Sequence, residues 1–392
     1  MKNKGRIVME ELKNCLFHAD HKMKQVNKFN NLPLDYNPMD ICKLSFYYCS
    51  KCGYVSQESE IIDNKKSLYF STILKQEDRN GLIPDFKQLS FFKNLFPYIE
   101  KDDNILEIGS NSGYNMSFFK NNGFENIESV ELNPFNAKSA KEKGFEVYNM
   151  NYLDFIIKKD YKLILLSHVL EHISEPKIFL NKIYNDMNND AILYIEVPDM
   201  AAHYMDKTIY EFYEDHMIYA DQDIWKRILE SMGFNIVNII DRSDYHSVGF
   251  ILKKADNLDI KLSEINVETS ILDYLELQAF YSKIVSSYFN NLNDNKLAFY
   301  PLNIQPTIMM IYQNQNILNN IKFFIDDKLC NTEQYMTKDV FSLENAPISD
   351  DIIIIISTQK KDLQEKLFSK AQKLYPNNKI VKLLDLVHGE TE

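Results

Sequence analysis

The chain has 392 residues, a hydrophobic fraction of 45% and a net charge of −12. This length predicts two or three domains, and the apolar content is sufficient for sizeable cores. The negative charge, with acids and bases interspersed, argues against nucleic acid as a partner. No stretch is long and apolar enough for a membrane span, and residues 1–13 lack the apolar core of a signal peptide. We therefore expect a cytoplasmic protein.

The cysteines are unevenly spread, with four of the five in the first 52 residues. Two pairs of candidate metal ligands share a two-residue spacing: Cys15 with His18, and Cys49 with Cys52. In a reducing compartment such pairs favour a metal over disulfides, and three thiolates with one imidazole suit tetrahedral Zn²⁺. We predict a structural zinc bound by these four residues. His21 and Cys42 are alternatives for the fourth position, and a group of ordinary buried thiols is the alternative to a metal site.

The segment Asn104–Gly113, NILEIGSNSG, predicts a buried strand, a tight turn and a helix that begins at residue 114 and ends at residue 121. The strand ends at Gly109, and the turn passes through Asn111. Such a turn directs backbone N–H groups and a helix N-terminus toward whatever lies above the strand. The turn does not follow the G-x-G-x-x-G pattern of dinucleotide-binding proteins. The alternative is a generic α/β turn with no ligand.

Further apolar runs predict strands at residues 128–130, 145–148, 162–166, 191–197, 235–240 and 248–253. Polar side chains follow the first three of these runs. Glu131 stands where a carboxylate accepts both hydroxyls of a ribose. Asn151 and Asp154 follow the second run, and either is a candidate partner for an adenine amino group. Ser167 and His168 follow the third.

The turn and the acid before it resemble motif I of the class I methyltransferases, which use S-adenosylmethionine. Glu107 precedes the first glycine by two residues, and residues 167–172, SHVLEH, resemble the "hvlEH" segment of that family. The resemblance implies a Rossmann-like α/β core in which the acid of motif I helps to receive the methionine ammonium. The cofactor-binding residues that it implies are Glu107, Gly109, Asn111, Gly113, Glu131, Asn151, Asp154, Ser167 and His168.

A narrower resemblance covers nearly the whole chain. A zinc-knuckle-like module, the "YFS" segment Tyr69–Ser71 and then LEIGSNSG are similar to the sugar C-methyltransferases that act on nucleotide-linked ketosugars. That family implies three parts: a zinc-binding module with a bridge (1–90), a methyltransferase domain (91–255) and a C-terminal Rossmann-like α/β domain (256–392).

The last part predicts a second, smaller parallel α/β unit. Its expected helices are 270–289, 308–319 and 360–373, and its expected strands are 297–300, 321–325, 351–357 and 380–386. The family has a glycine-rich turn after the first of these strands, whereas residues 300–306, YPLNIQP, contain no glycine. This departure favours a packing or substrate-shaping role over a nucleotide pocket.

The segment after the predicted strand 191–197 carries the candidate catalytic residues. Tyr213, His216 and Tyr219 fit the family's "Y-H-E-H-x-x-Y" segment, while Glu214 replaces its first histidine and Asp215 its glutamate. In a helix these three rings would lie near one face. The alternative is a surface helix with a solvated histidine.

An imidazole beside a carboxylate and phenols is suited to acid–base chemistry near neutral pH. We expect His216 to be the base, with Asp215 orienting it and with Tyr213, Tyr219 and Tyr69 holding an enolate oxygen or the sugar. His246 is a second candidate. The predicted reaction is methyl transfer to carbon of a nucleotide-linked ketosugar in bacterial-type glycan biosynthesis. The alternatives are sugar O-methylation and a non-catalytic subunit that binds the cofactor.

Overall fold

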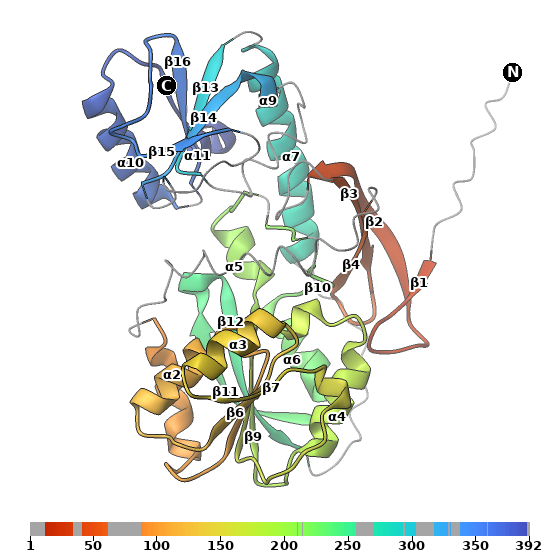
Figure 1. Ribbon diagram of the computed structural model, residues 1–392. Helices are drawn as coiled ribbons and strands as arrows, with labels where there is room; N and C mark the ends of the chain where they lie inside the picture. The colour runs from red at the N-terminus through yellow and green to blue at the C-terminus, as the bar shows by residue number, and fades with distance from the viewer. Residues whose placement is uncertain are drawn as a thin grey trace, which may run out of the picture.

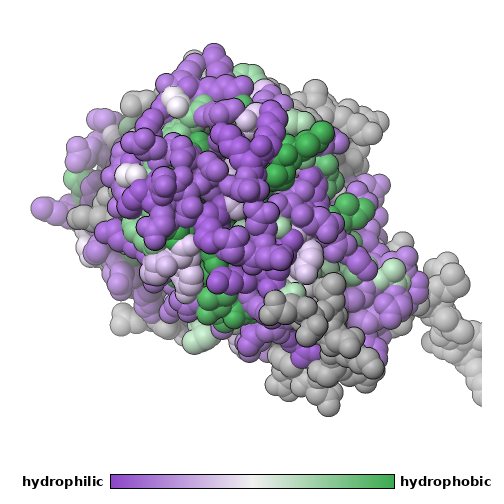
Figure 2. All heavy atoms as spheres, turned by 90° about the horizontal axis from the view of Figure 1, so that it is seen from below, coloured by the Kyte–Doolittle hydropathy of each residue, from purple (hydrophilic) through white to green (hydrophobic). Residues whose placement is uncertain are grey.

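The computed structural model describes residues 12–33, 41–61, 88–209, 211–213, 215–255, 270–292, 295–302, 317–327, 330, 338–358 and 360–389. Their strands form three sheets, and the largest lies in the middle third of the chain (Figure 1). Among the helices of these residues, none is long and apolar enough to cross a membrane. Hydrophilic residues cover most of the surface seen from below the view of Figure 1, and the apolar areas there are small and separate (Figure 2).

The central sheet has seven strands in the order β11-β12-β9-β8-β5-β6-β7. Their bounds are Ile105–Ile108 (β5), Ile127–Val130 (β6), Glu146–Tyr148 (β7), Leu163–Ser167 (β8), Ile192–Pro198 (β9), Phe234–Arg242 (β11) and Ser247–Lys254 (β12). β12 is antiparallel to both of its neighbours, and the pairs from β9 to β7 are parallel. Each strand lies within about two residues of its prediction. The predicted Rossmann-like core is confirmed.

Helices cover both faces of this sheet, because alternate strand residues point to opposite sides. Ile164 and Leu166 pack with apolar residues of α4 and α6, whereas Leu163 and Leu165 pack with those of η2, α2 and α3. The helices of this part are η2 (Ser90–Tyr98), α2 (Tyr114–Asn121), α3 (Pro134–Glu142), η3 (Tyr152–Asp154), η4 (Leu170–His172), α4 (Pro176–Asp186), α5 (Met200–Met205), α6 (Gln222–Ser231) and η5 (Ser243–Tyr245).

The N-terminal sheet is antiparallel and has the order β1-β2-β3-β4-β10. Four of its strands are consecutive in sequence: Leu12–Asn14 (β1), Lys22–Pro33 (β2), Ile41–Tyr48 (β3) and Val55–Ile61 (β4). The fifth, β10 (Ile218–Tyr219), comes from the segment after β9 and pairs with β4. The predicted catalytic segment is therefore built into the edge of the cysteine-bearing module.

The C-terminal sheet is parallel, with the order β15-β14-β13-β16-β17. Its elements are α7 (Ser270–Asn290), β13 (Lys296–Tyr300), α9 (Ile317–Asn320), β14 (Ile321–Ile325), β15 (Val340–Phe341), β16 (Ile352–Ile356), α10 (Lys361–Leu374), β17 (Ile380–Lys382) and α11 (Leu383–His388). The strand predicted at 380–386 is wrong in its second half. Leu383, Leu384 and Val387 form one turn of helix whose side chains are buried in the core that α7 shares. Most of the helix predicted at 308–319 lies outside the described residues.

Helix α7 also joins the C-terminal part to the central one. It packs beside α5 in Figure 1, and the Gln278 side chain donates to the Thr208 backbone carbonyl at 2.8 Å. The hydroxyls of Tyr274 and Thr208 are 3.0 Å apart. The C-terminal part is thus anchored next to the end of α5.

Candidate active site

The predicted turn after β5 is present, and α2 begins directly after Gly113. Gly109, Asn111 and Gly113 all have positive φ, of 76°, 50° and 83°. A Cβ on Gly109 would lie 2.6 Å from Cγ2 of Val169. Glycine is therefore required here by backbone conformation and by packing against the loop after β8, in addition to any close approach of a ligand.

Two buried acids flank this turn. Glu107 is 2% exposed, and its Oε1 accepts a hydrogen bond from the Asn115 side chain at 2.7 Å. Burial raises the pKa of Glu107 to about 8. Glu131 accepts from the backbone N–H groups of Asn111 and Asn133, at 2.8 and 2.7 Å. Two acidic side chains at this edge suit a cationic amino-acid ligand with a ribose diol, because an ammonium group beside Glu107 favours its ionised form, and they do not suit a pyrophosphate.

The other predicted cofactor residues meet different local partners. The Asn151 side chain caps η3 by accepting from the Leu153 N–H at 3.0 Å. Asp154 is exposed at the end of the same turn. The Ser167 hydroxyl donates to Oε2 of Glu196 at 2.8 Å. The structure places all of these residues at or just beyond the carboxyl ends of strands, where ligands bind in α/β sheets.

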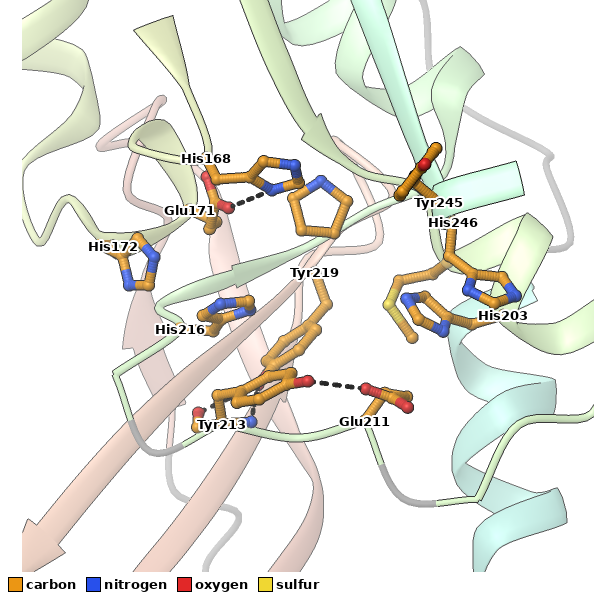
Figure 3. Close-up of a pocket in the computed structure, with 12 residues that line it drawn as sticks. His168, Glu171, His172, His203, Glu211, Tyr213, His216, Tyr219, Tyr245 and His246 are labelled. Carbon is orange, nitrogen blue, oxygen red and sulfur yellow. Dashed lines mark hydrogen bonds and ion pairs between the residues drawn. The ribbon is translucent and has the colours of Figure 1, made fainter. Parts of the chain in front are cut away.

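A cavity of about 310 Å³ lies beyond the ends of β8 and β9 (Figure 3). Five of the eight histidines of the chain line it. They are His168, His172, His203, His216 and His246. Tyr213 and Tyr219 also line the cavity, so the predicted catalytic residues do come together with the loop after β8. Tyr69 lies outside the described residues.

The segment that carries these residues is not the predicted helix. The described residues between α5 and β10 are irregular, and Tyr219 is in β10. The rings nevertheless meet: the His216 centroid is 4.8 Å from that of Tyr213 and 5.8 Å from that of Tyr219. Pairing with β4 overrides the helical spacing, because β10 completes the edge of a sheet.

Asp215 does not orient His216 as predicted. Its backbone oxygen lies 3.1 Å from Nδ1 of His172, and its Oδ2 lies 3.4 Å from the same atom. The His172 ring in turn meets the His216 ring edge-on, with 4.6 Å between the centroids. The carboxylate therefore acts on the catalytic candidate through a second imidazole.

The charges in the pocket are set by Glu171, which is fully buried. Its Oε1 lies 3.2 Å from Nδ1 of His168. Burial alone would favour the neutral acid, but this hydrogen bond and the charges of His168, His172 and His216 lower the pKa of Glu171 to about 2. Loss of hydration opposes a charge on His168, whose side chain is still 46% exposed, but Glu171 and Glu196 together raise the pKa of His168 to about 9. At neutral pH these groups form an ion pair.

Two other histidines of the pocket have the opposite tendency. Burial, reinforced by the charge of His172, lowers the pKa of His216 to about 4. Burial, reinforced by His246 and His216, lowers the pKa of His203 to about 3. The imidazole rings of His203 and His246 are stacked with centroids 4.5 Å apart. Both low-pKa histidines are neutral at pH 7, which leaves His216 with a basic lone pair.

Sequence reasoning missed Gln57, a residue of β4 that is 1% exposed. Its side-chain amide donates to the Tyr213 carbonyl at 2.6 Å and its Oε1 accepts from the Tyr219 hydroxyl at 3.2 Å. Its backbone N–H donates to the Met217 carbonyl at 3.0 Å. No motif marked this residue, because its function depends on a contact between segments that are distant in sequence. His203 and Glu211 of the pocket were missed for the same reason.

The N-terminal module gathers the predicted metal ligands. Donor atoms of Cys15, His18, His21 and Cys52 lie within 4.8 Å of one another. The Cys52 sulfur is 3.3 Å from Nδ1 of each histidine and 3.6 Å from the Cys15 sulfur. The Cys49 thiol is fully buried in the same module, but it is not one of the four residues whose donor atoms meet this distance. Softness and spacing of these donors fit zinc.

Four donors thus converge, and the predicted ligand Cys49 is not among them. The structure brings His21 into the set on the same terms as His18. Residue 42 lies near the far end of β3, seven residues before Cys49, or roughly 23 Å at the rise of a strand. Gly53 has a φ of 89° and its N–H donates to the Cys49 carbonyl at 2.7 Å, which closes the knuckle turn.

Comparison with known proteins agrees with this geometry. A family model described as a methyltransferase domain matches residues 76–239. No curated protein matches the sequence. An S-adenosylmethionine-dependent methyltransferase of Clostridium acetobutylicum is 14% identical, with 48% of this chain and 99% of that chain covered and a TM-score of 0.38. A methyltransferase of Archaeoglobus fulgidus, described as SAM-dependent, is 20% identical. The comparison covers 47% of this chain and 99% of that chain, with a TM-score of 0.37. With TM-scores below 0.5, these structures add nothing to the family match.

The matched segment contains the glycine turn, both acids and four of the five histidines that line the cavity. Residues 76–239 are therefore a methyltransferase domain with the class I fold, and the chain is a methyltransferase.

Proposed function

We propose that the protein transfers a methyl group to carbon of a nucleotide-linked ketosugar in bacterial-type glycan biosynthesis. The observation that carries this proposal is the position of neutral His216 between two tyrosines in the cavity at the sheet edge. A cavity of about 310 Å³ is at the lower end of the range for small-molecule sites. It suits the sugar ring, so we expect the nucleotide to lie outside it.

In this proposal the motif residues hold the cofactor. Glu107 receives the methionine ammonium, Glu131 the ribose hydroxyls, and the turn from Gly109 to Gly113 the amino-acid carboxylate. Asn151 or Asp154 meets the adenine, and Ser167 and His168 border the cofactor on the substrate side. The cofactor supplies an electrophilic methyl group on a sulfonium. The chain supplies alignment of the attacking carbon with that methyl group.

His216 removes the proton α to the ketone, which leaves an enolate. The low pKa of His216 keeps its imidazole neutral for this step, and Glu171 stabilises the imidazolium that forms. Tyr213 donates to Glu211 at 2.8 Å, so this phenol is ordered toward the cavity. Tyr69 of the bridge donates to the enolate oxygen, or Tyr213 does so by turning from Glu211, because a phenol has only one proton to donate. Tyr219 is committed to Gln57 and shapes the wall.

The N-terminal module has a supporting role in this proposal. A structural Zn²⁺ bound by Cys15, Cys52, Cys49 and either His18 or His21 closes the turn between β3 and β4. β4 then holds the Tyr213–Tyr219 segment through Gln57. We infer three functional parts, residues 1–90, 91–255 and 256–392, in a cytoplasmic enzyme whose partner is a small-molecule sugar substrate.

The test is incubation of the protein with S-[methyl-¹³C]adenosylmethionine and a panel of nucleotide ketosugars. Carbon NMR of the product distinguishes a methyl group on carbon from one on oxygen. We expect a C–CH₃ signal, and solvent deuterium at the α position of the ketosugar. An O–CH₃ product without exchange would show instead that His216 deprotonates an alcohol. No product from any ketosugar would refute the substrate class.

A further inference from the structure

The geometry points to a second metal site, inside the catalytic pocket, in which Glu171, His172 and His216 bind a divalent transition-metal ion and thereby inhibit methyl transfer. The inhibition rests on the proposed function, because the ion would occupy the imidazole that acts as base. The binding of the ion does not depend on the proposed function. The site is separate from the cysteine-bearing site of the N-terminal module.

The three donors already converge. One ligand atom of each residue lies within 4.8 Å of the others, the same criterion that the Cys15, His18, His21 and Cys52 group meets. Glu171 and His172 lie in η4, and His216 lies in the segment before β10. The Met217 N–H donates to the Glu171 carbonyl at 2.6 Å, which fixes these two segments against each other. Figure 3 shows the three side chains on the same side of the pocket.

The Glu171 carboxylate has an unused oxygen. The residue is fully buried, and its Oε1 is engaged by His168 at 3.2 Å. Within the described part of the chain, its Oε2 has no hydrogen-bond partner. A buried carboxylate oxygen without a partner is costly, and such an atom calls for an explanation such as an ion or a ligand. A cation between Glu171 and the two imidazoles would satisfy it.

His172 is held as metal-binding histidines commonly are. Its Nδ1 lies 3.1 Å from the Asp215 carbonyl oxygen, a distance at which the N–H donates to it. This tautomer leaves the Nε2 lone pair free for a ligand bond. Metal-bound histidines usually donate their other N–H to a carbonyl or carboxylate in this way. Glu171 is held in a similar way, because Nδ1 of His168 lies within hydrogen-bond distance of its Oε1.

The donor set selects the kind of ion. Two imidazoles and one carboxylate suit Zn²⁺, Co²⁺ and related ions, whereas Mg²⁺ and Ca²⁺ prefer oxygen ligands. The three residues leave coordination positions open for water or a sugar oxygen. An ion bound through the lone pair of His216 prevents that nitrogen from accepting the α proton. Metal occupancy and base catalysis are therefore mutually exclusive.

The binding test uses Co²⁺ added to protein that already contains its N-terminal zinc. Cobalt bound by thiolates has an intense charge-transfer band in the near ultraviolet, whereas cobalt bound by nitrogen and oxygen has only weak visible bands. We expect weak visible bands to saturate at one added ion per chain, without the thiolate band. Glu171→Gln should weaken this binding by at least about 100-fold, more than the loss of an outer-shell partner would.

The control is Glu196→Gln, which removes another buried carboxylate near His168 that is already satisfied by Arg242 and Ser167. This variant should still bind the pocket ion. If Glu171→Gln is unstable by thermal melting, His172→Gln serves in its place. A cobalt spectrum with the thiolate band alone, or equal binding by the parent and the Glu171 or His172 variant, would overturn the site.

Inhibition is measured separately, as the decrease in methyl transfer against added Zn²⁺. We expect the concentration for half inhibition to match the dissociation constant of the pocket site. The affinity for S-adenosylmethionine should not change. Occupancy without inhibition would refute the inhibitory role and leave the metal site intact. Absence of activity on every ketosugar would refute the proposed substrate without affecting the cobalt spectrum.

Discussion

Gln57 and Tyr219 are 162 residues apart in sequence, yet the tyrosine hydroxyl donates to the glutamine Oε1 at 3.2 Å in the interior of the protein. The same glutamine binds the Tyr213 carbonyl at 2.6 Å. One side chain of the N-terminal module therefore fixes both ends of the segment that presents His216. The cysteine-bearing module and the segment that carries His216 are therefore held together by these hydrogen bonds.

We predict that Gln57→Leu lowers kcat roughly 10-fold to 100-fold, because leaving buried hydrogen-bond partners unsatisfied costs about 1–3 kcal/mol and displaces the catalytic rings. The dissociation constant for S-adenosylmethionine, measured by calorimetry, should stay near that of the parent. Gln57→Glu keeps one acceptor for Tyr219 and should recover part of the activity.

The matched control is Glu58→Gln on the next residue of β4. Glu58 is exposed and pairs with Lys13, away from the pocket. Its substitution should change neither kcat nor zinc content. If Gln57→Leu turned over at the parent rate, the module would have no part in positioning the segment.

Glu131→Gln should weaken the binding of S-adenosylmethionine by about 1.5–3 kcal/mol, because a charged acceptor for two ribose hydroxyls is lost. Calorimetry measures this change. Glu128→Gln on the same strand is the control, since the Glu128 carboxylate is bound by Tyr161 at 2.7 Å and by Lys159. Equal affinities of the Glu131 and Glu128 variants would contradict the placement of the ribose.

His216→Asn should lower turnover by ~10²–10⁴-fold, the usual contribution of a general base, while cofactor affinity is retained. The variant should also lose the exchange of solvent deuterium into the α position of the ketosugar. His246→Asn alters the opposite wall of the pocket and should cost less. Exchange at the parent rate in the His216 variant would assign the base elsewhere, with His246 the first residue to examine.

The protein should lose stability as the pH falls below 6.5, in part through His203. Burial lowers the pKa of this histidine from 6.5 to about 3, so between these values the unfolded chain binds a proton that the folded protein does not. Stability from this group is complete above pH 6.5 and decreases toward pH 3, by at most about 1.4 kcal/mol per pH unit.

Denaturant unfolding at several pH values tests this dependence. His203→Gln should flatten the slope between pH 6 and pH 4. His388→Gln, at a partly exposed position near the C-terminus, should leave the slope as in the parent. Parallel slopes for the parent and the His203 variant would show that other groups carry the acid sensitivity.

The N-terminal site should retain about one zinc per chain after dialysis against metal-free buffer. Cys52→Ala should abolish retention, since the Cys52 sulfur lies 3.3 Å from Nδ1 of both histidines. Comparison of His18→Ala with His21→Ala identifies the fourth ligand, because only one of them should lower zinc content strongly. Metal analysis by mass spectrometry gives the result. Retention of zinc by the Cys52 variant would contradict this site.

The central domain was predictable because its signals are local. The apolar run at Ile105–Ile108, the glycines that require positive φ and the polar residues at strand ends each occupy a few consecutive positions. The order of strands then follows from the rules of parallel α/β sheets. The zinc cluster was predictable in part, because two-residue spacing indicates ligand pairs but does not choose between His18 and His21.

The catalytic segment was less predictable because long-range contacts determine its conformation. Spacing by threes indicated a helix for Tyr213, His216 and Tyr219, but β4 offers an open sheet edge that Tyr219 pairs with. The same holds for Asp215, whose partner is His172 and not the adjacent His216. Neither contact leaves a periodic pattern in the sequence.

The short strand β10 has a consequence for protein engineering. Ile218–Tyr219 closes the edge of the N-terminal sheet, so a module boundary drawn by residue number cuts through a shared structure. A chimaera that exchanges residues 1–90 with a relative would place a foreign β4 against a native β10. We expect such a chimaera to fold and work only when the 211–219 segment is transferred as well, so that β4 and β10 come from the same protein.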